Sequence, residues 1–523
     1  MMENQVDIMG RMRVDEKASF IYFVYPFLFD PDEFTSRVNA VESASFQGTK
    51  RELPVWEPEK FPEDDLHAHI ADYLNRREGK TATARLWHIS SELDRVYGFV
   101  GKADWSLLLR SKEELPFKFG GKGRFTVELV LFRIGVGFLA INARPTTADA
   151  DRWCDFLHYF RFTRGERGVK IRASARRGPD EAKGPFFPEP AGGLAAHPDG
   201  TGPLSELCEA LLQTVSLEEE ERQWWRDVFV PGQLIPFASL YIDDLPENDR
   251  PGMLYRIRNF FHSGQEIHPT ADDLRADNTA LLQYAEGDWF TFSLEGGTFT
   301  AFDAPKTPFF RETMPNHLKN QYYLLFLLAL QQRFALIMLS EEVASRWLPT
   351  GQGLEIETRT AAFGRIRDGL LLFTASGYFK QVMQRENHHR CYLKWQEIFQ
   401  VDILFQEVTG EVAEMHDYLM MRLAEQRNAI EEQKRRSAQE AADRADRLAR
   451  LLNLVAWVIG IPAFATFVLS ATGGVSKWAT AYWVIGGFLI GGLMFLLFNR
   501  LIMRWLARKR ADDKGERSAP RVE

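Results

Sequence analysis

Two long uncharged runs near the C-terminal end constrain the fold of this sequence more than any other feature. The first covers residues 451–470, and the second covers residues 481–498 and can extend to residue 503. Roughly twenty helical residues, at ~1.5 Å each, cross a hydrocarbon core of roughly 30 Å. Because only residues 471–480 separate the runs, we expect a transmembrane helical hairpin with a short outer loop, rather than a buried hairpin in a soluble core.

Basic residues flank both predicted spans. Three arginines between residues 444 and 450 precede the first span, and five basic residues between residues 500 and 510 lead into a basic tail over residues 504–523. The loop between the spans carries only Lys477. Because cationic residues accumulate on the cytoplasmic side of membrane helices, we expect a multi-pass protein of the inner (cytoplasmic) membrane with both termini in the cytosol.

The remainder of the sequence has the composition of a soluble protein. Of its 523 residues 26% are charged, and the mean hydropathy is −0.27, which is too polar for a transporter built from many spans. The net charge of −8 gives no general signal for a nucleic-acid partner. Cys154, Cys208 and Cys391 form no CxxC motif, as is typical of a reducing compartment. No apolar run follows the first charged residues, so we expect no signal peptide.

Before the membrane, the pattern predicts one large α+β domain in two parts. Residues 1–173 form the N-terminal part, and residues 204–315 form the second. Between them, residues 174–203 are rich in proline and glycine, which predicts a linker or insertion. The expected strands are residues 19–29, 84–89, 237–242 and 253–261, the expected hairpins are residues 125–143 and 289–304, and the expected helices are residues 149–162 and 204–215.

A helical region follows over residues 316–410. Residues 316–347 hold two apolar runs separated by Gln331, Gln332 and Arg333. Because these polar side chains would be costly in lipid, we expect a buried soluble helix rather than a third span. Further long amphipathic helices are expected over residues 351–384 and 392–409.

Residues 411–450 predict a long charged stalk helix. This segment contains no glycine or proline, and it carries a thin apolar seam between solvated sides. The seam consists of Met415, Leu419, Leu423, Ile430, Ala438, Ala441, Ala445 and Leu448. Since the stalk enters the first span without a helix breaker, we expect one continuous helix over residues 411–470.

This constellation resembles the CorA-type divalent cation transporters. They combine an α+β cytosolic domain, long helices and a C-terminal two-helix transmembrane hairpin. Their first span commonly contains a proline, and at its outer end a Gly-Met-Asn signature in a pentameric ring selects hydrated magnesium. Pro462 stands at the matching place, and the signature would fall on Ala471, Thr472 and Gly473. The resemblance implies a homo-oligomer, a pentamer, in a lipid bilayer, and a possible divalent cation.

The sequence departs from this family at the signature. Gly473 has no side chain to replace the amide that holds hydrated Mg²⁺, and Lys477 would repel cations. Some CorA-like proteins that lack the signature accompany antiviral systems, where a cytosolic domain senses a nucleotide messenger. Three functions stay open: a CorA-like oligomeric channel or transporter for cations, a membrane effector gated by a cytosolic small-molecule ligand, and a non-conducting membrane-anchored scaffold.

The two spans have different expected roles. The first continues from the stalk, so we expect it to line the pore with small or polar residues at helical spacing, and the second to be the outer helix. The expected pore-lining residues are Asn453, Gly460, Ala463, Thr466 and Ser470. The expected helix-packing residues are Pro462 in the first span and Gly486, Gly487, Gly491 and Gly492 in the second.

Four other clusters carry potential ligands or charges. Asp64, Asp65, His67 and His69 are either ligands of a metal site or the acidic start of a surface helix. His388 and His389, next to Cys391, are either ligands of a metal site or residues that pack against neighbouring side chains. The glycine-rich turn at residues 120–123 lacks the spacing of a phosphate-binding loop. The basic run at residues 434–436 either faces solvent or, in a symmetric bundle of several copies, forms a ring of positive charge. We expect no catalytic residues.

Overall fold

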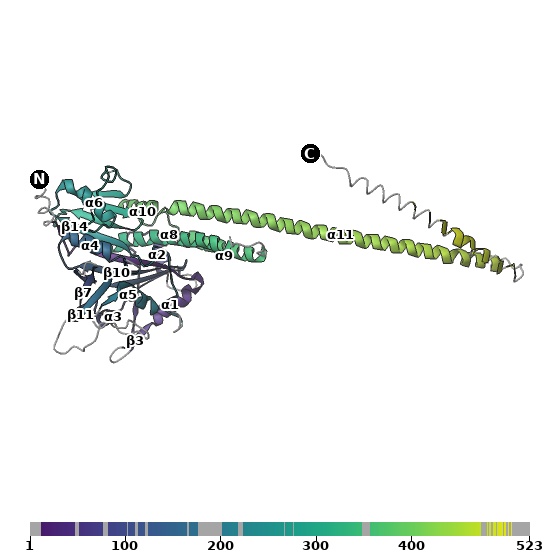
Figure 1. The fold of residues 1–523 in the computed structure, drawn as a ribbon, viewed down its shortest axis with the longest axis horizontal. Helices are drawn as coiled ribbons and strands as arrows, with labels where there is room; N and C mark the ends of the chain where they lie inside the picture. Colours follow the sequence, from purple (N-terminus) through teal and green to yellow (C-terminus); the bar gives the residue numbers. More distant parts are fainter. Residues whose placement is uncertain are drawn as a thin grey trace. The chain divides into compact units, whose positions relative to one another are not determined.

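The structure is a computed structural model, and its described residues fall into two compact units, residues 1–419 and residues 420–523. Figure 1 follows the chain from the sheet-bearing first unit into the long helix α11. The described residues are 12–47, 52–76, 82–101, 103–109, 113–120, 124–164, 167–175, 201–217, 223–265, 267–275, 277–347, 356–471, 478–479, 481–482, 485–487, 489–494, 496–497, 500 and 504.

Among these residues, the first unit is built on one sheet of 15 strands. Its main path runs β12-β11-β7-β8-β10-β2-β14-β17-β16-β15, and the other five strands pair beside it, while β3 and β4 form a separate pair. The strands are β1 (Arg13–Val14), β2 (Phe20–Leu28), β3 (Ser45–Gln47), β4 (Glu52–Pro54), β5 (Trp56–Glu59), β6 (Ala84–Ile89), β7 (Ala103–Leu108), β8 (Glu114–Phe119), β9 (Val127–Phe132), β10 (Val136–Pro145), β11 (Lys170–Ala175), β12 (Thr201–Pro203), β13 (Arg226–Asp227), β14 (Ile235–Asp243), β15 (Leu281–Ala285), β16 (Asp288–Ser293) and β17 (Gly296–Phe302).

The centre of the sheet is buried on both faces. Strand β2 lies between β10 and β14 and is antiparallel to both, and β14 pairs in parallel with β17. Every residue of β2 is buried. Phe20 and Tyr22 belong to one hydrophobic core, whereas Ile21 and Phe23 belong to the other. Because successive side chains of a strand point to opposite faces, the two cores lie on the two sides of the sheet.

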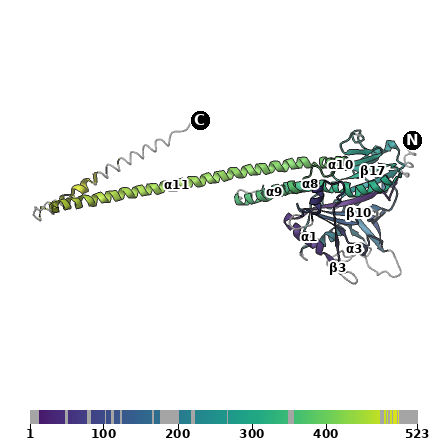
Figure 2. The same ribbon diagram turned by 180° about the vertical axis from the view of Figure 1, so that it is seen from behind.

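Helices cover both faces. Helices α8 and α10 contact β10 and β16 from the core that holds Phe20, and α4 and α6 contact β10 and β17 from the other core. Figures 1 and 2 show this assembly from opposite sides. The helices are α1 (Phe34–Ser43), α2 (Ala68–Asn75), α3 (Ser91–Val96), α4 (Ala150–Tyr159), α5 (Leu204–Gln213), α6 (Arg250–Arg258), α7 (Met314–His317), α8 (Tyr323–Glu342), α9 (Ile356–Ser376), α10 (Glu386–Ile398) and α11 (Val401–Ala471), with short turns η2 (Pro31–Glu33), η4 (Glu247–Asp249), η5 (Phe309–Thr313), η6 (Leu318–Tyr322) and η7 (Val343–Trp347).

The apolar helical segment ending at Trp347 is a core helix, as the sequence predicts. The segment Phe309–Trp347 is long and apolar enough to cross a membrane, but 83% of its most apolar window is buried. Gln332, one of the polar residues in its middle, finds hydrogen-bond partners inside the protein. The Gln332 amide donates to the carbonyl of Gly377 at 2.7 Å and accepts from Gln396 at 2.9 Å. A polar network thus anchors α8 to α10 and to the chain that follows α9.

Most of the predicted elements are confirmed. Strand β6 has the predicted bounds, and the segment of residues 125–143 contains β9 and most of β10, with Gly135 in the turn at φ 91°. Such a positive φ favours glycine. The hairpin of residues 289–304 corresponds to β16 and β17, and α4 and α5 occupy the predicted helical segments.

Three predicted elements are wrong or misplaced. Residues 253–261 belong mainly to α6 rather than to a strand, because Pro251 favours a helix start and Met253, Leu254 and Ile257 are buried at helical spacing. The helix predicted over residues 351–384 is described from Ile356 and ends at Ser376, before Gly377.

The helix predicted over residues 392–409 is also interrupted. Helix α10 ends at Ile398, and Gln400 adopts a φ of 56° before α11 begins at Val401. The predicted linker is narrower than residues 174–203, because its ends belong to β11 and β12, and residues 176–200 lie outside the described residues.

Helix α11 confirms that the predicted stalk and first span form one continuous helix. It covers 71 residues from Val401 to Ala471, which corresponds to roughly 100 Å at 1.5 Å per residue. It begins earlier than the expected residue 411. The structure therefore shows a mixed α/β domain followed by long helices, one of which carries a long apolar segment.

Candidate functional site

The apolar part of α11 is the strongest functional feature of the chain. The helix is apolar enough to cross a membrane over an 18-residue window, with a mean hydropathy of 2.0, and none of that window is buried. Trp457 and Phe464 are each 70% exposed, and large apolar side chains project all around the segment. Since such a surface is unfavourable in water, the segment is a candidate membrane span.

The predicted pore-lining residues all lie on this uncovered segment. Asn453, Gly460, Ala463, Thr466 and Ser470 are exposed, and so is the bulky Phe464 on another face. Exposure in a single chain therefore does not separate a pore face from a lipid face. The assignment of these five residues to a pore stays a prediction.

Pro462 lies inside α11 without ending it. Proline has no backbone N–H, so one carbonyl of the preceding turn loses its helical partner. The Thr466 hydroxyl donates to the carbonyls of Pro462 at 3.0 Å and Ala463 at 2.8 Å, and the Ser470 hydroxyl donates to Phe467 at 2.8 Å. Both hydroxyls are thus satisfied within the helix, which lowers the cost of placing them in an apolar environment.

The second predicted span is described only in part. Residues 485–487 and 489–494 are helical. A Cβ built on Gly486, Gly487, Gly491 or Gly492 meets no atom within 4 Å, so each glycine has open space beside it. The expected packing through these glycines stays a prediction. Of the expected pore mouth, Ala471 ends α11, and Thr472 and Gly473 lie outside the described residues.

The apolar face of α11 changes from covered to uncovered along the helix. Val412, Met415 and Leu419 are buried in the core of the first unit. In the second unit, Leu423 is 39% exposed and Ile430 is 53% exposed. The seam predicted from the sequence therefore continues beyond the residues that the first unit covers.

The structure brings Asp65 and His388 together, although their two clusters are far apart in the sequence. The carboxylate of Asp65 accepts from Arg385 at 2.7 Å, and its other oxygen lies 3.9 Å from Nδ1 of His388. Burial lowers the pKa of His388 to about 4, and its ring packs against Tyr322 with 4.6 Å between ring centroids. The described residues contain no group of three or more His, Cys, Asp or Glu that could hold a metal ion, and His389 gains no third ligand. This geometry supports packing of His388.

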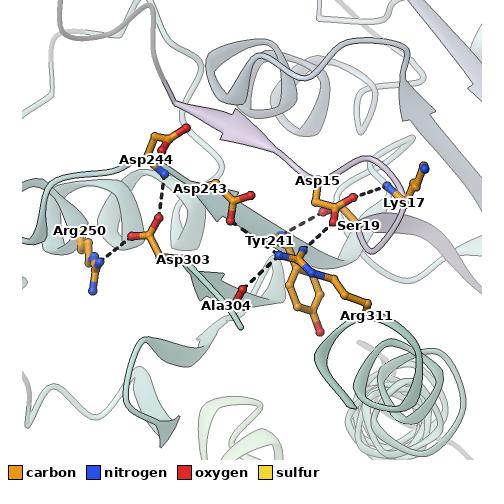
Figure 3. A network of polar contacts seen from close by, with 10 residues as sticks. All are labelled: Asp15, Lys17, Ser19, Tyr241, Asp243, Asp244, Arg250, Asp303, Ala304 and Arg311. Carbon is orange, nitrogen blue, oxygen red and sulfur yellow. Dashed lines mark hydrogen bonds and ion pairs between the residues drawn. The ribbon is translucent and has the colours of Figure 1, made fainter. Parts of the chain in front are cut away.

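Ion pairs that join the sheet to the helices occupy another polar region. In Figure 3, Arg311 of η5 lies among Asp15, Asp243 and the carbonyl of Ala304. Its guanidinium is 2.6 Å from Asp15 and 3.9 Å from Asp243, and it donates to Ala304 at 3.1 Å. The neighbouring pair of Arg250 and Asp303 has a separation of 2.7 Å. Because these charges are paired, the network anchors the start of the helical layer to the sheet.

Sequence reasoning missed a large charged cleft in the first unit. The cleft has a volume of about 1200 Å³ and lies between the end of β2, the start of β13 and helices α8 and α9. Trp224, Trp225 and Arg226 line one side, and Glu341 and Arg365 line the helical side. Arg226 pairs with Glu341 at 2.5 Å. No local motif signals this cleft, because Arg226 and Glu341, which pair across it, are 115 positions apart in the sequence.

The chain was compared with protein-family models, with curated proteins and with solved structures, and none of the three comparisons finds a match.

Proposed function

We propose that this protein is a CorA-like oligomeric ion channel or transporter of the cytoplasmic membrane, with a large cytosolic regulatory domain. The continuity of α11 carries the proposal. One helix is packed into the first unit through Met415 and Leu419 and carries, further along, an uncovered apolar segment long enough to span a bilayer. A change in the cytosolic unit would be transmitted directly to the span, because no loop interrupts the helix.

An oligomer follows from the small number of spans. One helical hairpin cannot enclose an aqueous path, so several copies must surround an axis. The resemblance to CorA-type proteins favours a pentamer. The uncovered seam at Leu423 and Ile430 supplies an apolar face for such an assembly.

The proposed pore has no fixed charge within the first span. Residues 451–470 contain no charged side chain, so gating in this region would proceed by dewetting of an apolar constriction rather than by a charged filter. Without the signature asparagine, discrimination among ions should be weak. The resemblance implies cations as the transported ions.

A ligand-gated membrane effector is the second candidate, and the large cleft is the observation that favours it. The cleft touches α8 and α9, and aromatic side chains of α9 and of η7, which follows α8, contact α11. Trp347 packs against Tyr418 at 5.7 Å between ring centroids, and Phe363 packs against His416 at 5.9 Å. A small molecule in the cleft could therefore act on the base of α11 by moving α9.

Reconstitution into lipid vesicles tests the proposal. The full-length protein should solubilise as an oligomer and support ion flux across vesicles, whereas empty vesicles should not. A protein that stays monomeric at all concentrations, under conditions that preserve other membrane oligomers, would exclude transport. An oligomer without flux would leave the ligand-gated effector and the membrane-anchored scaffold as the candidate functions.

A further inference from the structure

We infer that the channel formed by this chain favours anions over cations, because the seam of α11 presents cations and no carboxylate to the axis of a parallel bundle. This inference rests on the proposed channel function, and it departs from the cations implied by the CorA resemblance. It depends on three observations: the period of the seam, the charge at its centre and the positions of the acidic residues.

The helix face that carries most of the apolar seam of α11 can be followed through positions eleven residues apart. Eleven residues correspond to about three helical turns, so positions eleven apart stay within ~20° on the helix surface. Three such series start at buried residues of the first unit and continue through the stalk. They are Val412, Leu423, Lys434 and Ala445; Met415, Gln426, Ser437 and Leu448; and Leu419, Ile430, Ala441 and Leu452. The face packed up to Leu419 is thus the same face that is uncovered from Leu423 onward.

A second copy of this chain is the partner that fits the seam. Copies inserted in one membrane share their orientation, so their stalks are parallel and equivalent residues meet at one level. Beyond Leu423 this face is a narrow row of mostly apolar and small residues, interrupted by Gln426 and Lys434, as in helix bundles, and not a broad patch for an unrelated globular partner. An eleven-residue period gives a nearly straight or slightly right-handed bundle.

Lys434 is the only charged residue among these twelve positions of the seam face. At 100° per residue it lies about 30° from the middle of the seam, whereas Arg436 lies about 130° away. In a parallel oligomer, the Lys434 ammonium groups therefore form one ring of positive charge around the axis. Such rings attract anions and repel cations at the approach to a pore.

The acidic residues of the stalk lie away from the seam. Glu431 and Glu440, the acids nearest to it, project about 90° from its middle, whereas Arg427 and Arg444 project about 70° or less from it. Arg444 also pairs with Glu440 at 3.7 Å. The carboxylates thus neutralise the outside of the stalk and leave the axial side positive.

Reversal potentials in planar bilayers test this inference. With a potassium chloride gradient across the membrane, the unmodified protein should show a chloride-to-potassium permeability ratio above one. Lys434→Glu should lower this ratio at least roughly tenfold, because each copy changes its axial charge by two units. Arg436→Glu makes the same charge change outside the seam and should leave the ratio near its original value.

Cysteine cross-linking tests which face of the stalk meets the neighbouring copy, and it needs no measurement of current. Lys434→Cys should form disulfide-linked dimers in the membrane under mild oxidation, and Arg436→Cys should not. The reverse pattern would overturn the assigned seam. A current that prefers potassium in the unmodified protein would overturn the anion inference and leave the channel function standing, whereas an assembled protein without any current would overturn the channel function itself.

Discussion

Replacing Asp288 by asparagine should stabilise the protein at neutral pH and have no such effect in acid. Asp288 begins β16, is 2% exposed, and has a pKa raised from 3.8 to about 6 because burial removes water from its carboxylate. The folded protein therefore holds the proton more tightly than the unfolded chain does. The contribution of Asp288 to stability is full below pH 4 and is lost as the pH rises from about 4 to 6, where the unfolded chain releases the proton first.

The size of the effect follows from the pKa difference. A difference of about two units, at 1.36 kcal/mol each, corresponds to at most about 3 kcal/mol. Urea unfolding of the full-length protein in detergent, followed by tryptophan fluorescence, should show Asp288→Asn more stable by up to about 3 kcal/mol at pH 8. The two proteins should differ little at pH 4. An equal gain at both pH values, or a loss at pH 8, would refute the argument from carboxylate burial.

Other parts of the molecule give four further predictions. Gln332→Leu should destabilise the first unit by about 2–4 kcal/mol, measured by the same unfolding assay, because it removes two buried hydrogen bonds and leaves the carbonyl of Gly377 without its donor. The pKa of His388 is about 4, so the wild type should lose stability as the pH falls from about 6.5 to 4; His388→Gln should lose less over this interval in the same assay at each pH. Thr466→Cys should let a charged thiol reagent reduce the current, and Val468→Cys should not; the opposite pattern would reverse the pore face. Gly491→Leu should lower oligomer recovery in native gels by blocking close helix approach, and unchanged recovery would contradict the expected packing.

The sequence was sufficient where local pattern and chain continuity decide the structure. An uncharged apolar run can form only a buried or membrane helix, and α11 joins that run to the stalk because no glycine or proline separates them. Gln331, Gln332 and Arg333 correctly marked α8 as a core helix, since such side chains find partners more readily inside a protein than in lipid. The hairpin at Gly135 was also predictable, because a positive φ there favours glycine.

Only the tertiary structure decided which distant segments meet. Asp65 contacts Arg385 and Arg226 contacts Glu341 across long intervals of chain, and no local pattern encodes such pairings. The segment containing Met253 has apolar residues compatible with either a strand or a helix, and its burial against the sheet selects the helix α6. The sequence by itself therefore determined the apolar helices and many local elements. Burial and long-range ion pairs depend on the whole fold. The tertiary structure therefore decided the charged cleft, the sheet that is buried on both faces, and the burial of His388 and Asp288, which all require the helices to be packed on the sheet.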